Sequence, residues 1–293
     1  MKPYAWNGIH LQLPDDWEML QFSKDPAHGR IVFGDRYQLR FELDWAALDL
    51  PPDLDRMAED YKAKLIQDGI KEARHTARHP WQGVTGLQDG ARISRYCAYF
   101  NDRTYLLEAI FLWPQDDNPR HNPQFEARLL ETIRVVPLQD DHLQEWNAFG
   151  IRCLAPDDHR LDDCLAEPAN VRLTFTSPDR RLEETATRIG MLKAWLNRGV
   201  DDYLRTLIPK DYSLLSMSHA TQDGHDVWTA EATITRAVLT DWWHGRRHFS
   251  AAAWICPQDQ RLRILTRTAP DRRDGLPPPP VALSCCDKLE VTL

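Results

Sequence analysis

The chain matches itself when it is shifted by 142 positions, and this internal repeat limits the possible folds more than any other feature. Gly8-Ile9 then falls on Gly150-Ile151. The same shift superposes further identical residues: Pro14-Asp15-Asp16 on Pro156-Asp157-Asp158, Pro26-Ala27 on Pro168-Ala169, Phe33 on Phe175, and Asp60-Tyr61 on Asp202-Tyr203. We therefore predict two copies of one module, residues 1–137 and 146–293, joined by a short polar linker at 138–145.

Local patterns give the expected elements of one module. Ile9, Leu11 and Leu13 alternate with polar residues, as in a half-buried strand. Asp53 can cap a helix that runs to about Gln67 with apolar residues at helical spacing. The other expected elements are strands at 30–34, 37–45, 71–78, 91–100 and 105–113, and a closing helix at 123–135. The predicted order is β-β-β-α-β-β-β-α, an α+β class in which each repeat packs a mainly antiparallel sheet with helices.

One resemblance rests on the opening strand, Gly8-Ile9-His10-Leu11-Gln12-Leu13-Pro14-Asp15-Asp16-Trp17. An apolar strand followed by Pro, a polar turn and Trp resembles the start of the PsbP/Mog-like superfamily. That resemblance implies a mainly antiparallel sheet between helices and a binding or assembly role, with no catalytic residues to carry over. In the second copy His159 replaces the Trp.

Composition limits the classes of partner. A formal net charge of −8 disfavours both nucleic acid and an anionic membrane surface, which are bound through Lys and Arg. We find neither the apolar core of a signal peptide nor a run of about 20 apolar residues. The six cysteines show no CxxC spacing, so we expect reduced thiols and a cytoplasmic location.

The cysteines of the second copy occupy apolar positions of the first. Aligned pairs are Leu11 with Cys153, Phe100 with Cys256, Leu129 with Cys285 and Leu130 with Cys286. Because free Cys behaves as a small hydrophobe, we interpret them as structural thiols and predict no metal ligand and no cofactor. A redox or metal site at Cys285-Cys286 is the alternative.

A second metal candidate is His244-Gly-Arg-Arg-His248, with His219 and His225 upstream. Two His at this spacing can bind zinc on one helix face, but Gly245 and the flanking strands favour a hairpin. We find no Gly-x-Ser-x-Gly elbow and no glycine-rich phosphate loop, so no catalytic residue is assigned.

An aromatic and basic segment is the candidate binding site. The second half of the repeat aligns with a shift of 156, and the 14-position difference predicts a longer hairpin near residues 241–249. Trp and Arg are enriched at binding hot spots. The candidate binding residues are Trp242, Trp243, His244, Arg246, Arg247 and His248. The alternative is that one Trp faces the core and the other covers the partner module.

The predicted function is a non-enzymatic binding or assembly protein, which acts through this hairpin or a surface between the repeats on a protein partner or small ligand. The alternative is a small-molecule hydrolase or transferase with a pocket between the repeats.

Overall fold

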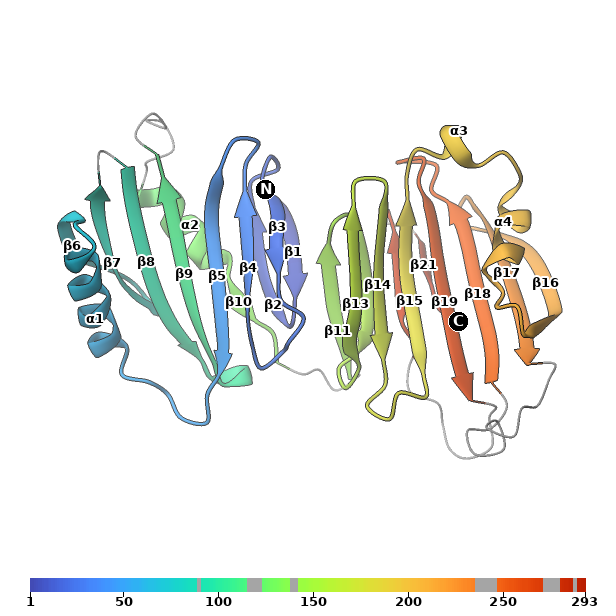
Figure 1. The fold of residues 1–293 in the computed structure, drawn as a ribbon, viewed down its shortest axis with the longest axis horizontal. Coiled ribbons are helices and arrows are strands. Elements are labelled where there is room, and N and C mark those ends of the chain that lie inside the picture. The colour runs from blue at the N-terminus through green and yellow to red at the C-terminus, as the bar shows by residue number, and fades with distance from the viewer. Residues whose placement is uncertain (89–90, 115–122, 138–141, 235–246, 271–279, 287–288) are drawn as a thin grey trace. The chain divides into compact units, whose positions relative to one another are not determined.

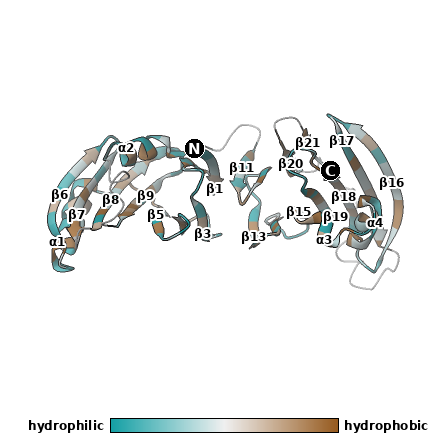
Figure 2. Cartoon of the chain, turned by 90° about the horizontal axis from the view of Figure 1, so that it is seen from above, coloured by the Kyte–Doolittle hydropathy of each residue, from teal (hydrophilic) through white to brown (hydrophobic). Residues whose placement is uncertain are grey.

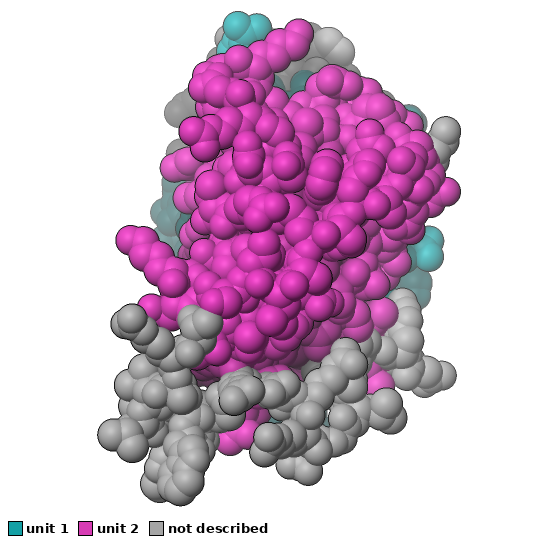
Figure 3. All heavy atoms as spheres, turned by 90° about the vertical axis from the view of Figure 1, so that its right-hand side faces the viewer, with its two compact units in different colours: residues 1–137 teal, residues 138–293 magenta. Residues whose placement is uncertain are grey.

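A computed structural model describes residues 1–293 except 89–90, 115–122, 138–141, 235–246, 271–279 and 287–288 (Figure 1). The chain divides into two compact units, Met1–Pro137 and Leu138–Leu293 (Figure 3). The second unit begins its first strand at Leu143, inside the segment expected to be a linker. Trp146 and Ala148 of that strand are buried, so this part of the chain belongs to a core.

The first unit contains two antiparallel sheets. Its elements are β1 (Lys2–Trp6), β2 (Ile9–Leu13), β3 (Glu18–Phe22), β4 (His28–Gly34), β5 (Leu39–Ala47), α1 (Leu54–Gln67), β6 (Lys71–Arg78), β7 (Trp81–Gln88), β8 (Ala91–Phe100), β9 (Tyr105–Trp113), α2 (Pro123–Thr132) and β10 (Arg134–Val135), with a 3-10 turn at Asn101–Arg103. The large sheet has the order β3-β4-β5-β9-β8-β7-β6. A small sheet has the order β10-β2-β1. Apolar and polar residues are mixed along the strands (Figure 2), as expected for sheets with one face in a core.

The second unit has a large sheet of the same strand order. Its elements are β11 (Leu143–Ala148), β12 (Ile151–Pro156), β13 (Arg160–Glu167), β14 (Asn170–Thr176), β15 (Glu183–Ile189), α3 (Leu192–Trp195), α4 (Val200–Leu207), β16 (Tyr212–Gln222), β17 (His225–Ile234), β18 (Arg247–Ile255), β19 (Leu262–Pro270), β20 (Ala282–Cys285) and β21 (Leu289–Val291). The large sheet is β13-β14-β15-β19-β18-β17-β16. The smaller sheet is β11-β12-β20-β21.

The predicted α+β class is wrong. Strands make up 58% of the described residues and helices 15%, so the fold is mostly β. The described residues contain only four α-helices. The prediction lacked strands such as β1, β3 and β7. It was also wrong at the end of the second copy, where a helix equivalent to the one predicted at 123–135 was expected. There Leu283 and Cys285 are buried and the segment pairs with β12 and β21 as strand β20.

The hairpins that open the two units explain why Gly8 matches Gly150 in the repeat. Asn7 and Gly8 connect β1 to β2 with φ of 50° and 75°, and Phe149 and Gly150 connect β11 to β12 with φ of 52° and 72°. Two consecutive residues of positive φ form the tight turn that suits twisted antiparallel strands, and the second position favours Gly.

Helices cover the large sheets in both units. Asp53 caps α1 as predicted, and its side chain accepts a hydrogen bond of 3.0 Å from the backbone N–H of Arg56. Tyr61 and Leu65 of α1 pack on β7 and β8. In the second unit, Leu204 of α4 packs on Ala230, Phe249 and neighbouring apolar residues of β17 and β18.

A buried carboxylate joins α2 to the large sheet of the first unit. Glu126 is 1% exposed and accepts hydrogen bonds from four side chains. They are Trp113 Nε1 at 2.7 Å, the Tyr96 hydroxyl at 2.7 Å, the Ser94 hydroxyl at 3.0 Å and Arg92 Nη2 at 3.2 Å. Buried charges are stable only when they are paired and hydrogen-bonded, so this network fixes α2 on β8 and β9.

Candidate metal centre

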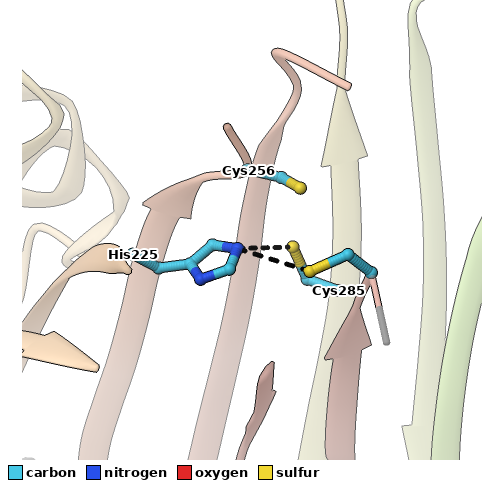
Figure 4. Close-up of side chains that lie close together, drawn as sticks. His225, Cys256 and Cys285 are labelled. Carbon is cyan, nitrogen blue, oxygen red and sulfur yellow. Dashed lines mark hydrogen bonds between the residues drawn. The ribbon is translucent and has the colours of Figure 1, made fainter. Parts of the chain in front are cut away.

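One histidine and three cysteines of the second unit lie close together in its interior (Figure 4). The ligand atoms of His225, Cys256, Cys285 and Cys286 all lie within 4.8 Å of one another. His225, Cys256 and Cys285 are at most 2% exposed, and Cys286 is half-buried. Such a set of sulfur and imidazole donors matches the Cys₃His composition of structural zinc sites.

His225 is positioned by a tight turn and by a hydrogen bond of its ring nitrogen Nδ1. Asp223 and Gly224, with φ of 48° and 77°, connect β16 to β17 and place His225 at the start of β17. The His225 Nδ1 lies 3.0 Å from the carbonyl oxygen of Asp223. Because a carbonyl only accepts hydrogen bonds, Nδ1 carries the proton and Nε2 presents its lone pair to the sulfur atoms. A second hydrogen bond of this kind orients most metal-binding histidines.

Cys256 follows the end of β18, beside His225. Val227 pairs with Trp254 in the register of β17 and β18, and the same register continued by two residues brings His225 opposite Cys256. The backbone N–H of Cys256 donates to the carbonyl of Arg261 at 3.0 Å. The turn at the end of β18 therefore fixes the position of this thiol.

Cys285 and Cys286 reach the cluster although they are adjacent in sequence. Successive side chains of a strand point to opposite faces of the sheet. Cys285 ends β20, and Cys286 has a left-handed backbone with φ of 48°. The change of backbone conformation after β20 lets both sulfur atoms lie near His225.

Two of the distances in the cluster agree with a tetrahedral ion. The Cys285 and Cys286 sulfur atoms lie 3.5 Å and 3.6 Å from His225 Nε2. With Zn–S of about 2.3 Å and Zn–N of about 2.0–2.1 Å, a regular tetrahedron separates sulfur from nitrogen by roughly 3.5 Å. A disulfide between the neighbours is unfavourable, because adjacent Cα atoms are about 3.8 Å apart and disulfides need about 4.4–6.8 Å.

Without an ion the Cys285 thiol stays neutral. Burial, together with the neighbouring Cys256 thiol, raises the pKa of the Cys285 thiol to about 12. A metal ion replaces these protons and pairs the thiolates with positive charge. The site can thus bind a soft divalent cation, and its donor set favours zinc over the hard cations calcium and magnesium.

The residues predicted for the binding hairpin remain mostly undescribed. Trp242, Trp243, His244 and Arg246 lie outside the described residues. Arg247 begins β18 and is exposed, while the half-buried His248 pairs with Thr233 and Ala269. The role of this segment in binding stays a prediction.

The four-residue cluster was not predicted as a unit. From the sequence, His225 is a candidate ligand together with the hairpin histidines. Cys285-Cys286 is a separate candidate, and Cys256 is interpreted as a structural thiol. Their positions along the chain give little sign of a shared site. Cys285 and Cys286 are adjacent, and no two of the four residues have the spacing of two to five intervening residues that is typical of zinc ligands. Their proximity depends on the order of strands in two sheets.

Comparisons with known proteins identify no family. No family model matches the chain, and no curated protein matches it. Solved structures of the immunity protein TplEi of T6SS from Pseudomonas aeruginosa are similar at 8% sequence identity. The apo structure gives a TM-score of 0.37 and covers 93% of this chain and 88% of that chain. The structure complexed with "L" peptide gives 0.40, with 94% and 89% covered. Similarity at this level carries no argument about function.

No helix among the described residues has the length and apolar character that a membrane-spanning helix requires.

Proposed function

We propose that this chain is a non-enzymatic binding and assembly protein whose second unit is held together by one structural zinc ion. The observation that carries the zinc assignment is the convergence of His225, Cys256, Cys285 and Cys286 within 4.8 Å. Three thiolates and an imidazole with a fixed proton fit the ligand chemistry and the size of this ion.

A structural role follows from the number of ligands and their burial. A catalytic zinc ion keeps an open position for water or substrate and has three protein ligands. Here four side chains would complete the tetrahedron, and three of them are nearly inaccessible to solvent. A zinc hydrolase would need such an open position.

The ion would join the two sheets of the second unit. His225 and Cys256 belong to neighbouring strands of the large sheet, β17 and β18, whereas Cys285 ends β20 of the smaller sheet. A bond network through one ion would fix residues 282–286 on the large sheet. A cross-link between segments far apart in sequence also restricts the unfolded chain, as a disulfide does.

Metal analysis tests the zinc assignment. We expect about one zinc ion per chain by mass spectrometry of the purified protein, and at least about tenfold less in a Cys285→Ser, Cys286→Ser double variant, which removes two of four ligands. Cys164→Ser is the matched control, because Cys164 lies in β13 outside the cluster, and it should keep the metal. His225→Cys should also keep zinc as a Cys₄ site, whereas His225→Ala should lose it. Zinc-free wild-type protein, or a double variant that retains zinc, would contradict the proposal.

The edge strand β16 favours assembly with a second copy of this chain. It ends the large sheet and has eleven residues, nearly all exposed, with none of Asp, Glu, Lys or Arg. The corresponding edge β6 carries Lys71, Glu72, Arg74 and Arg78. Charged side chains protect sheet edges from pairing. Two copies of β6 would therefore bring several charged side chains to a shared edge, whereas two copies of β16 would bring none of Asp, Glu, Lys or Arg.

Sedimentation tests this assembly. We expect the wild-type protein to show a reversible, concentration-dependent dimer of the 34.0 kDa chain. Leu215→Lys with Ser218→Lys should give a monomer, because two lysines on an edge strand hinder its pairing with a second copy. Ile66→Lys adds a charge at an equally exposed residue of α1, and this control should still dimerise. A wild-type monomer at all concentrations, or a dimer that survives the β16 changes, excludes pairing through β16.

A further inference from the structure

Three arginine side chains of the second unit gather beside the turn that joins β11 to β12. Arg188 lies near the end of β15, and Arg261 and Arg263 lie at the start of β19. A Cβ atom added to Gly150 would be 3.4 Å from Nη1 of Arg188 and 3.4 Å from Nη1 of Arg261. The two guanidinium groups therefore end at the same turn, and Arg263 Nη1 donates to the Gly150 carbonyl at 2.7 Å.

The hydrogen-bonding capacity of this cluster is not filled by the described residues. Arg188 and Arg263 are 7% and 6% exposed, and the buried Nε of each has no hydrogen-bond partner among those residues. Asp259 is the acid that contacts the cluster: its Oδ2 lies 2.7 Å from Arg263 Nη2 and 4.0 Å from Arg261 Nε. A buried donor without an acceptor costs about 1–3 kcal/mol, and more when it is charged.

The fold itself does not require arginines at this place. Arg188 and Arg263 are direct cross-strand partners, each one residue from the end of the β15–β19 pair. In the first unit, the same position of the β5–β9 pair holds Ala46 and Leu106. Like charges placed directly opposite each other destabilise a sheet, so the second unit carries a cost that its counterpart avoids.

Electrostatics of the cluster favour an anion. Three guanidinium groups and one carboxylate give an excess of two positive charges. Burial, followed by the nearby Arg261 and Arg263, lowers the pKa of Arg188 to about 10. A zinc ion with three thiolates and a neutral imidazole would carry one negative charge, and Arg263 lies near enough to Cys285 to affect that thiol. The three arginines, Asp259 and the zinc cluster together would still have a net charge of one positive unit.

We infer that Arg188, Arg261 and Arg263 form a binding site for an oxyanion, a phosphate or carboxylate group, at the β11–β12 turn. The planar guanidinium group donates paired hydrogen bonds to such oxygens. Arg261 is 42% exposed and gives the ligand access from solvent. Neither the zinc ion nor pairing through β16 is needed for this site. An experiment can therefore contradict oxyanion binding without contradicting the zinc ion or the dimer, and the reverse also holds.

Calorimetric titration of the purified full chain tests the site, with sodium phosphate and sodium acetate as probes and sodium chloride at equal ionic strength as reference. We expect phosphate or acetate to bind where chloride does not, and the better of the two identifies the oxyanion class. Arg188→Met, which keeps the side-chain volume without the charge, should raise the Kd at least about tenfold. Arg261→Ala, at a half-exposed residue that the fold does not need, should also weaken binding.

Arg172→Ala is the matched control, because Arg172 is exposed and pairs with Asp163. Its strand partner is Thr187, so its side chain lies on the face of the sheet opposite to that of Arg188. It should bind the probe as the wild type does. Circular dichroism confirms that each variant is folded. The inference is overturned if neither oxyanion binds the wild type, or if both Arg188→Met and Arg261→Ala bind as tightly as the wild type.

Discussion

Removal of the zinc ion is expected to lower the free energy of unfolding of the second unit by about 4 kcal/mol, if the free zinc concentration before removal is about a thousand times the Kd. For a unit of this size, that loss lowers the melting temperature by roughly 10 °C. The cause is the loss of an ion that joins β17 and β18 to β20. Calorimetry of the full chain before and after a strong chelator measures the shift, and hydrogen exchange should locate it in residues 225–234 and 282–286.

The double variant Cys285→Ser, Cys286→Ser provides the control for chelation. It lacks two ligands, so the chelator should leave its melting temperature unchanged. Hydrogen exchange in β4 and β5 of the first unit should be the same with and without the ion. An equal shift of the melting temperature in wild type and variant would show that the chelator acts at another site. No shift in the wild type would contradict a structural zinc ion in the second unit.

Glu126→Ala should have the largest effect on the first unit, a loss of about 3–5 kcal/mol in the free energy of unfolding. The substitution takes away the acceptor of Trp113, Tyr96 and Ser94 and the carboxylate that faces Arg92, all in a site that is 1% exposed. Urea unfolding measures the loss.

Two variants sharpen this test. Glu131→Ala removes an exposed carboxylate of the same helix and should cost less than about 0.5 kcal/mol. Glu126→Gln keeps the size and one acceptor oxygen, so its loss should be intermediate. Equal stability of Glu126→Ala and Glu131→Ala would contradict the role of the network.

Several elements of the fold follow from local sequence patterns. The alternation at Ile9, Leu11 and Leu13 predicts β2, and Asp53 with its apolar stripe predicts α1. These predictions succeed because each depends on the pattern of residues within a single short segment of the chain.

Other elements depend on contacts that no local pattern reveals. β7 was missed because Gly83 and Gly86 interrupt its apolar residues. The structure explains Gly83: an added Cβ would lie 2.4 Å from the Arg95 carbonyl oxygen of the neighbouring strand β8. The segment at 282–285 was expected to be helical, but its apolar residues fill the gap between β12 and β21 as a strand.

The candidate metal centre could be predicted only in part. The adjacent Cys285 and Cys286 suggest a metal or redox site, and His225 is a possible ligand. What joins them is the pairing of β17 with β18 and the return of β20 to the same region, which spacing along the chain does not encode. The prediction of structural thiols used the alignment with apolar residues of the first copy. That alignment gives burial correctly for Cys256 and Cys285, but it contains no information about which buried thiols meet.

X-ray absorption at the zinc edge of the purified full chain tests the central claim most directly. The expected spectrum has three sulfur neighbours at about 2.3 Å and one nitrogen neighbour at about 2.0–2.1 Å. His225→Cys should convert it to four sulfur neighbours at the same distance. A first shell dominated by oxygen, or an ion with fewer than three sulfur ligands, would contradict a structural zinc site at His225, Cys256, Cys285 and Cys286.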